Sequence, residues 1–252
     1  MATYRLTVSY DGSQFKGWQR HPGQPTVQGA LEAALLETSD VRAPIEGSGR
    51  TDAGAHADAQ VASVTLPDDT ILPDLNQALP EGVRVLDASP VPDGFHARMD
   101  STGKTYRYVI WNAPECPKDK VGRVWHIPGP LDVEAMRAAC PHFVGELDFA
   151  TFAKKPNFER ATTVRNMASV ELEHEAETIT ITMRADSFLY KMVRNVVRTI
   201  VKAGEGRFDP ESIPKLIAAC DRKAAPGTAP ASGLYLEAVH YPESGTVPDF
   251  NR

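Results

Sequence analysis

Stretches in which hydrophobic and polar residues alternate run through this sequence, and they restrict its fold more than any other feature. Residues 4–10 alternate in this way, and so does ETITITMRA at 177–185. A period of two is typical of a strand with one buried face. Another predicted strand, at 163–173, directly precedes the one at 178–185, so the two together predict an antiparallel hairpin.

Helices are predicted between the strands. Thr26 is a typical N-cap residue and begins an amphipathic helix. Residues 188–203 are the best-defined helix, because seven apolar residues recur on one face. A helix at 131–144 contains Pro141, which should bend or shorten it. A further helix begins at 209–210, where proline takes a tolerated first helical position.

The order of these elements predicts an α+β fold. Further strands are predicted at 60–65, 83–87, 104–112 and 234–241. Because the strands do not alternate regularly with helices, we expect a largely antiparallel sheet with helices packed on one face. Each half contains a strand, a helix and strand pairs, so we place a boundary near residue 100 and expect halves at 1–100 and 101–252.

Composition narrows the class of protein. The chain has 252 residues, of which 42% are hydrophobic and 24% charged, as in folded domains. Three widely separated cysteines without a CxxC motif argue against a disulfide framework and a structural zinc site. No apolar run approaches the roughly 18 residues of a membrane span, and the N-terminal residues resemble a strand, not a secretory signal. We therefore expect a cytoplasmic protein without membrane association.

Basic residues are distributed unevenly in a chain whose net charge is −6. Residues 184–207 contain six basic and two acidic side chains, and residues 154–165 contain four basic and one acidic. Most acidic residues lie elsewhere in the sequence. An acidic protein with a basic face can still bind RNA, because local charge and not net charge decides the contact.

The segment GSGRTDAGAHADAQV at 47–61 is the strongest functional signal. Its glycines permit a tight loop between two predicted strands. Asp52 stands in this loop, two residues after Arg50. A carboxylate held rigidly at the end of a strand can act as a nucleophile or a base. The residue type suits equally well an aspartate that only caps a turn.

The sequence favours neither of two other kinds of site. Asp52, His56 and Asp58 carry groups that bind hard metal ions, as in a metal-dependent nuclease or phosphohydrolase. Because no further carboxylate or histidine cluster accompanies them, a metal site is disfavoured. A serine hydrolase is disfavoured because the sequence has no GxSxG motif.

Six segments, in order, resemble the TruA family of tRNA pseudouridine synthases. They are YDGSQFKGWQR (10–20), the glycine-rich segment at 47–61, FHARMDSTGKTYRY (95–108), DFATF (148–152), DSFLYKMVRNVVRTIVKAGEG (186–206) and ASGLYLEAVHYP (231–242). The resemblance therefore covers nearly the whole chain.

The resemblance implies an enzyme that converts uridine to pseudouridine at tRNA positions 38, 39 and 40, in the anticodon stem-loop. It implies no metal or organic cofactor. The implied fold has two similar halves around a long, mainly antiparallel sheet, with helices on one face and a central active-site cleft. It also implies a homodimer, with one tRNA bound across both subunits.

The resemblance also assigns roles to individual residues. Asp52 matches the catalytic aspartate, and Arg194 of MVRN matches the arginine that pairs with it. Tyr106 of KTYRY matches the tyrosine that stacks on the target base. Arg50 matches the arginine that helps to open the substrate and stabilise the flipped nucleotide, and Leu234 of GLYL matches the apolar residue that lines the base pocket.

The chemistry is reasonable for these residue types. An anionic carboxylate near the anomeric carbon can attack the sugar or abstract the ribose 2′ proton, in a site that excludes water. The planar guanidinium of Arg194 would favour the anion of Asp52. Flipping the base costs a few kcal/mol, and stacking on Tyr106 returns about 1–3 kcal/mol. A strand tyrosine that only packs sideways in the sheet would give the same sequence pattern.

Further RNA contacts are expected from basic residues. Lys191, Arg194, Arg198 and Lys202 form one stripe of the predicted helix at 188–203, which suits a phosphate backbone. A solvated helix face would produce a similar charge run.

The aromatic and basic loop at 11–25 contributes Phe15 and Gln19 as expected contacts, although the neighbouring Trp18 suits a core position equally well. Tyr190 and Lys191 stand where the family often has histidine before MVRN, and this difference concerns RNA contact rather than the nucleophile. The competing class is a non-catalytic RNA-binding protein of the same fold, in which Asp52 is only structural.

Overall fold

The computed structural model describes residues 1–67, 70–154 and 162–242 and divides into two compact units. The first comprises residues 1–102 together with the chain from Tyr235 onwards, and the second comprises residues 103–234. The division after Thr102 lies close to the boundary expected at residue 100. The last strand, which we expected in the second half, packs instead with the first unit.

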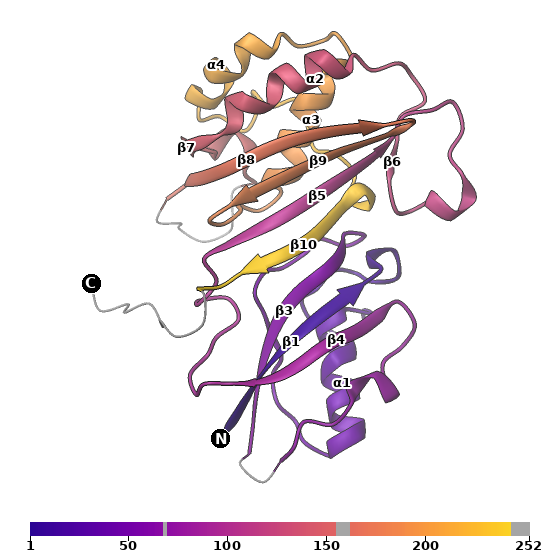
Figure 1. Ribbon diagram of the computed structural model, residues 1–252, viewed down its shortest axis with the longest axis vertical. Helices are drawn as coiled ribbons and strands as arrows, with labels where there is room; N and C mark the ends of the chain where they lie inside the picture. The colour runs from indigo at the N-terminus through magenta and orange to yellow at the C-terminus, as the bar shows by residue number, and fades with distance from the viewer. Residues whose placement is uncertain (68–69, 155–161, 243–252) are drawn as a thin grey trace. The chain divides into compact units, whose positions relative to one another are not determined.

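The sheet of the first unit has the strand order β4-β1-β3-β10 (Figure 1). Its strands are β1 (Ala2–Tyr10), β2 (Glu46–Gly47), β3 (His56–Leu66), β4 (Val83–Val91) and β10 (Leu234–His240). β1 is antiparallel to both β3 and β4. β10 is parallel to β3, with Tyr235 opposite His56. β10 therefore borders the strand that directly follows the loop containing Asp52.

One α-helix, α1 (Val27–Ser39), lies on one side of this sheet (Figure 1). Thr26 is its N-cap, as expected, and its side chain accepts a hydrogen bond from the backbone N–H of Gly29. Leu31 and Leu35 are fully buried. Two 3-10 helices, η1 (Gly12–Gln14) and η2 (Leu75–Gln77), complete the unit.

The sheet of the second unit has the order β5-β9-β8-β7 and is antiparallel along this path. Its strands are β5 (Gly103–Trp111), β6 (Trp125–His126), β7 (Gly145–Asp148), β8 (Val164–Glu175) and β9 (Thr178–Ala185). The predicted hairpin is confirmed as β8 and β9. The short strand β6 pairs in parallel with β5, and neither β6 nor β7 was expected.

The helices of the second unit are α2 (Val133–Ala139), α3 (Met192–Gly204) and α4 (Ile213–Ala218), with the 3-10 helices η3 (Lys118–Lys120), η4 (Cys140–Phe143), η5 (Ala150–Phe152), η6 (Pro210–Ser212) and η7 (Ala231–Gly233). Pro141 lies in η4, so α2 is shortened as predicted. The prediction that the next helix begins at residue 188 is wrong. Lys191 has a left-handed backbone with a φ of 64°, and α3 begins after it.

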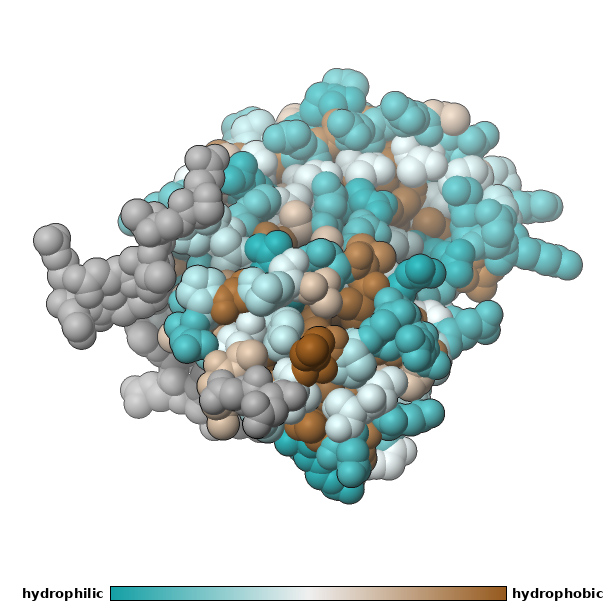
Figure 2. Space-filling view, turned by 60° about the horizontal axis from the view of Figure 1, so that its bottom comes forward, coloured by the Kyte–Doolittle hydropathy of each residue, from teal (hydrophilic) through white to brown (hydrophobic). Residues whose placement is uncertain are grey.

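The expected α+β class is confirmed, since the described residues combine four α-helices with mainly antiparallel strands. Among these residues, none of the helices has the length and hydrophobicity of a membrane-crossing segment. Hydrophilic side chains predominate on the face shown in Figure 2, with small hydrophobic patches between them.

Candidate active site

The Asp52 loop, residues 48–55, connects β2 to β3 in the first unit. Its tight turn is closed by the backbone N–H of Ala55, which donates to the carbonyl oxygen of Asp52 over 3.1 Å. Gly54 has a φ of 82°, which favours glycine at this position. Asp52 is half-buried and Arg50 is exposed. The loop therefore presents both side chains from a backbone of fixed shape.

Residues of the YDGSQFKGW motif pack directly against the backbone of the Asp52 loop. The N–H of Trp18 donates to the carbonyl oxygen of Thr51 over 3.2 Å. A Cβ atom at Gly17 would lie 2.8 Å from that oxygen, and one at Gly12 would lie 1.9 Å from the carbonyl oxygen of Ala55. Both glycines are thus required by the close approach of two backbone segments, which explains why this motif accompanies the loop.

Two buried side chains hold the loop from within the unit. The hydroxyl of Tyr10 lies 2.8 Å from Oγ1 of Thr51. Nε2 of Gln60 donates to the carbonyl oxygen of Gly49 over 2.8 Å. Burial raises the pKa of Tyr10 to about 12, although hydrogen bonds with Thr51 and Gln60 oppose the shift. Tyr10 is therefore a neutral phenol at physiological pH, and with Gln60 it positions the residues on either side of Arg50.

The loop at 11–25 is only partly exposed to solvent. Phe15 is 6% exposed and Trp18 is 2% exposed, so both rings belong to the core. Phe15 therefore supports this loop from within the first unit, and its contact with RNA stays a prediction. Gln19 is exposed, and its Nε2 donates to Oε1 of the buried Gln28 over 2.8 Å.

His56 is a structural residue in the first unit. It is 2% exposed, its Nδ1 accepts the N–H of Gly12 over 3.1 Å, and its ring stacks on Tyr235 with centroids 4.5 Å apart. Within residues 1–67, 70–154 and 162–242, no three His, Cys, Asp or Glu side chains are grouped as a metal ion requires. The arrangement of the described residues thus offers no support for the metal-site alternative.

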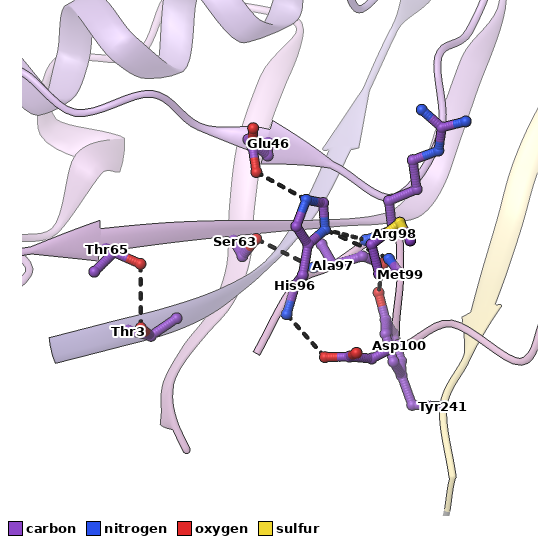
Figure 3. A network of polar contacts seen from close by, with 10 residues as sticks. All are labelled: Thr3, Glu46, Ser63, Thr65, His96, Ala97, Arg98, Met99, Asp100 and Tyr241. Atoms are coloured by element: carbon purple, nitrogen blue, oxygen red, sulfur yellow. Dashed lines mark hydrogen bonds and ion pairs between the residues drawn. The ribbon is translucent and has the colours of Figure 1, made fainter. Parts of the chain in front are cut away.

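The start of FHARMDSTGKTYRY forms a tight turn, which Figure 3 shows in close-up. Nδ1 of His96 accepts the backbone N–H groups of Arg98 and Met99, and its Nε2 lies 3.0 Å from Oε2 of Glu46. Oδ2 of Asp100 accepts the N–H of His96 over 2.8 Å. The guanidinium of Arg98 extends away from this network (Figure 3), so the histidine and aspartate of the motif have a structural role here.

Arg194 lies in the first turn of α3, in the second unit. Its Nε donates to the carbonyl oxygen of Ala229 over 2.7 Å, and the N–H of Ala229 donates back to the carbonyl oxygen of Arg194 over 3.1 Å. These reciprocal bonds fix the guanidinium relative to the segment 227–230.

That segment is itself held by the buried side chain of Asn195. Oδ1 of Asn195 accepts from Oγ1 of Thr228 over 2.6 Å and from Nη2 of Arg222 over 3.2 Å. Nδ2 of Asn195 donates to the carbonyl oxygen of Phe152. Asn195 therefore holds in place the segment that contains Ala229, to which Arg194 is hydrogen bonded.

Tyr106 and Leu234 also lie in the second unit, and each is 7% exposed. The ring of Tyr106 meets that of Phe188 edge to face, with centroids 4.9 Å apart. Leu234 follows Gly233, where a Cβ atom would lie 2.6 Å from the carbonyl oxygen of Val109. Close packing thus fixes the position of both side chains.

The basic stripe of α3 has intramolecular partners that the sequence did not reveal. Nη1 of Arg198 lies 3.3 Å from Oε1 of Glu205, and Nζ of Lys202 contacts Oε2 of the same carboxylate. The guanidinium of Arg198 also lies over the ring of Trp125, 5.3 Å from its centroid. Burial opposes ionisation of Glu205, but Lys202, Arg198 and Arg207 together hold its pKa below the usual value. Lys191 stands outside the helix and is half-buried.

Comparison with known proteins identifies the family to which this chain belongs. Residues 6–100 and 139–242 match the family described as tRNA pseudouridine synthase. The chain therefore belongs to the tRNA pseudouridine synthase family, which confirms the resemblance inferred from the six segments. The two matched ranges include the Asp52 loop in the first unit and Arg194 and Leu234 in the second.

Similar proteins cover nearly the whole chain. It is 43% identical over 243 residues to tRNA pseudouridine synthase A of Methylacidiphilum infernorum (isolate V4), with 95% of each chain covered. It is 42% identical over 245 residues to tRNA pseudouridine synthase A of Pelobacter propionicus, with 96% of this chain and 100% of the relative covered. It is 39% identical over 245 residues, with the same coverage, to tRNA pseudouridine synthase A 2 of Clostridium perfringens.

Proposed function

We propose that this protein isomerises uridine to pseudouridine at positions 38, 39 and 40 in the anticodon stem-loop of tRNA, with Asp52 as its catalytic carboxylate. The observation that supports this most directly is the Asp52 loop, whose backbone is held by Tyr10, Gln60 and the close approach of Gly12. Such fixation is what a residue needs if it is to meet one atom of a bound nucleotide.

The reaction begins when the target uridine leaves its stack. The carboxylate of Asp52 then acts at the ribose, by attack on the anomeric carbon or by removal of the 2′ proton, and the bond from the sugar to N1 of the base breaks. The detached base rotates and rejoins the sugar through its carbon 5, as the ester between Asp52 and the sugar breaks or as the 2′ proton returns to the ribose. Carbon 5 then loses its proton, and the former N1 gains one. Exclusion of water keeps the detached base from being lost.

Residues of the second unit supply the other roles in this proposal. Arg194 pairs with the carboxylate of Asp52 and favours its anion. Tyr106, with Phe188 at its side, offers an aromatic surface to the flipped base, and Leu234 lines the apolar part of the base pocket. The hydrogen bond from Nε of Arg194 to Ala229 supports this role, because it restricts the orientation of the guanidinium.

The remaining contacts concern the RNA outside the target base. Arg50 is exposed beside Asp52 and stabilises the flipped nucleotide, while Gln19, Lys191 and Arg198 contact the surrounding tRNA. Phe15 acts in this proposal only as a buried support of the loop that carries Gln19. We further propose that the protein is cytoplasmic, forms a homodimer and uses no cofactor. Size-exclusion chromatography with light scattering tests the homodimer, because it measures the molar mass in solution.

The activity is tested with an unmodified tRNA transcript that has uridine at positions 38, 39 and 40. Wild-type protein is expected to form pseudouridine there, as mapped by chemical labelling and primer extension. Asp52→Asn removes the anion with little change in shape, so it is expected to abolish the product while tRNA binding is mostly kept. Product formation by Asp52→Asn would contradict the assigned role of Asp52.

The competing function is RNA binding without catalysis, with Asp52 only structural. It predicts no pseudouridine from the wild-type protein and a loss of thermal stability in Asp52→Asn. A metal-dependent nuclease predicts cleaved tRNA and loss of activity in excess EDTA. The proposed isomerase predicts intact tRNA and product that persists in EDTA.

A further inference from the structure

Lys154, Tyr190 and Lys191 come together on the surface of the second unit, just before α3. Tyr190 is 45% exposed. Nζ of Lys154 lies 5.7 Å from the centroid of its ring, and Nζ of Lys191 lies 5.5 Å from it. The N–H of Lys154 also donates to the carbonyl oxygen of Tyr190 over 3.0 Å, which joins the two chain segments. We refer to these three residues as the Lys-Tyr-Lys cluster.

The cluster concentrates positive charge. Each ammonium is attracted to the ring, and this attraction keeps both positive charges within 5.7 Å of one ring centroid although they repel. Within the described ranges 1–67, 70–154 and 162–242, neither lysine forms an ion pair with a carboxylate. A bound anion would relieve the repulsion, so the cluster favours an anionic ligand.

The backbone supports the same conclusion. Lys191 adopts a left-handed conformation, with φ 64° and ψ 8°, which costs a lysine about 1–2 kcal/mol. It is the N-cap of α3 and makes no side-chain cap hydrogen bond, so the positive end of the helix dipole adds to the charge of the cluster. Arg194 follows three residues later, in the first turn of α3.

We propose that the Lys-Tyr-Lys cluster binds one phosphodiester group of the tRNA backbone, on the side of the second unit where α3 begins. The two ammonium groups contact the phosphate oxygens, and the ring of Tyr190 holds those groups in place. This inference rests on the proposed function for the position of the phosphate relative to the target uridine. It assigns a specific phosphate contact to Lys154 and Lys191, and it assigns to Tyr190 the role of positioning them.

The test is the salt dependence of tRNA binding. Dissociation constants for an unmodified tRNA transcript are measured between about 50 and 200 mM salt for the wild-type protein and for Lys154→Gln/Lys191→Gln. Loss of one phosphate contact is expected to reduce the slope of log Kd against log salt by about 0.7, and to weaken binding about fivefold at about 0.1 M salt. Lys154→Arg/Lys191→Arg keeps the charge and is expected to retain the wild-type slope.

Matched variants distinguish the loss of this phosphate site from a general loss of positive charge and from a loss of folded protein. Lys215 and Lys223 are exposed in the same unit, so Lys215→Gln/Lys223→Gln is expected to keep the wild-type slope. Tyr190→Leu keeps both lysines but is expected to weaken binding, because the ammonium groups are no longer gathered. Each variant is compared in thermal unfolding to confirm that it is folded.

A wild-type slope in Lys154→Gln/Lys191→Gln would overturn the proposal, and so would an equal loss in the control pair. Pseudouridine formation is assayed in parallel. If the wild-type protein forms no product while the slope still falls in the double variant, the proposed function fails and the phosphate site stands. If product forms and the slope is unchanged in the double variant, the proposed phosphate site is wrong and the proposed function stands.

Discussion

The hydroxyl of Tyr10 lies 2.8 Å from Oγ1 of Thr51, the residue directly before Asp52. Tyr10 is the last residue of β1 and is 5% exposed, so its position is set by the core. Movement of Thr51 necessarily moves Asp52, because the two are joined by one peptide bond. This hydrogen bond therefore connects the sheet of the first unit to the orientation of the proposed catalytic carboxylate.

Tyr10→Phe is expected to slow the reaction more than it weakens substrate binding. Small misplacement of a catalytic group can cost up to about 100-fold in rate, so we expect kcat to fall about 10- to 100-fold. The KM for tRNA is expected to change less than about twofold, because Tyr10 is buried and does not reach RNA. Tyr4→Phe, in the same strand, is the control and is expected to keep wild-type kcat. Equal kcat values for the two variants would contradict the positioning role.

Tyr10 also makes stability depend on alkaline pH. Its pKa is about 12 in the folded protein and about 10 in an unfolded chain. Between these values the unfolded chain loses the phenolic proton and the folded protein keeps it, so stability is lost as pH rises. The loss is about 1.4 kcal/mol per pH unit, and below pH of about 10 the contribution is fully present.

Tyr10→Phe has no phenolic proton at this position, so its stability is expected to fall less steeply with pH. Urea unfolding of both proteins at several pH values from about 9 to about 11.5 measures the two slopes. At neutral pH the variant is expected to be less stable by about 1 kcal/mol, because it lacks one hydrogen bond. Parallel declines in alkali would show that burial does not suppress ionisation of Tyr10.

Asn195→Ala is expected to lower both stability and kcat. The change removes the donor to the carbonyl oxygen of Phe152 and the acceptor of the Thr228 hydroxyl, at a cost of about 1–3 kcal/mol. It also loosens the segment that carries Ala229, on which Nε of Arg194 rests. Thr199→Val is the matched control, because Thr199 is equally buried in α3 but bonds only the backbone of Asn195. Thr199→Val is expected to lose stability but to keep the wild-type kcat. If kcat falls in proportion to stability in both variants, Asn195 has no specific role in positioning Arg194.

Glu205→Gln tests whether the basic stripe of α3 faces RNA. Glu205 is paired with Arg198 and Lys202, so its removal exposes positive charge that it now balances. We expect tighter tRNA binding and a steeper salt dependence, by up to about one unit of slope. Glu134→Gln in α2 removes an exposed carboxylate elsewhere and is expected to leave the slope unchanged. An unchanged slope in Glu205→Gln would place the stripe away from the phosphate backbone.

The strands were predictable because their residues alternate, and burial follows that alternation. In β9, Ile179, Ile181 and Met183 are fully buried, as expected of a strand with one covered face. Pro141 likewise ends α2 by a local steric rule. Such features depend on neighbours in sequence, and so they can be read from the sequence alone.

The details of the site depend on partners distant in sequence, and these were not predictable. Phe15 stands beside exposed polar residues, yet the fold covers its ring. Arg198 of the basic stripe lies over the ring of Trp125, a residue more than 70 positions away in sequence. Tyr10 and Gln60 read as ordinary strand residues, and only their contacts with Thr51 and Gly49 reveal a role in the loop.

The parallel pairing of β10 with β3 has a consequence for synthesis of the chain. Tyr235 lies beside His56, four residues beyond Asp52, although some 130 residues of the second unit are made between them. A ribosome thus completes the second unit before it delivers the strand that finishes the first. Because domains tend to fold as they emerge, the proposed nucleophile acquires its final surroundings only after β10 has been translated, and activity is expected to appear no earlier than that.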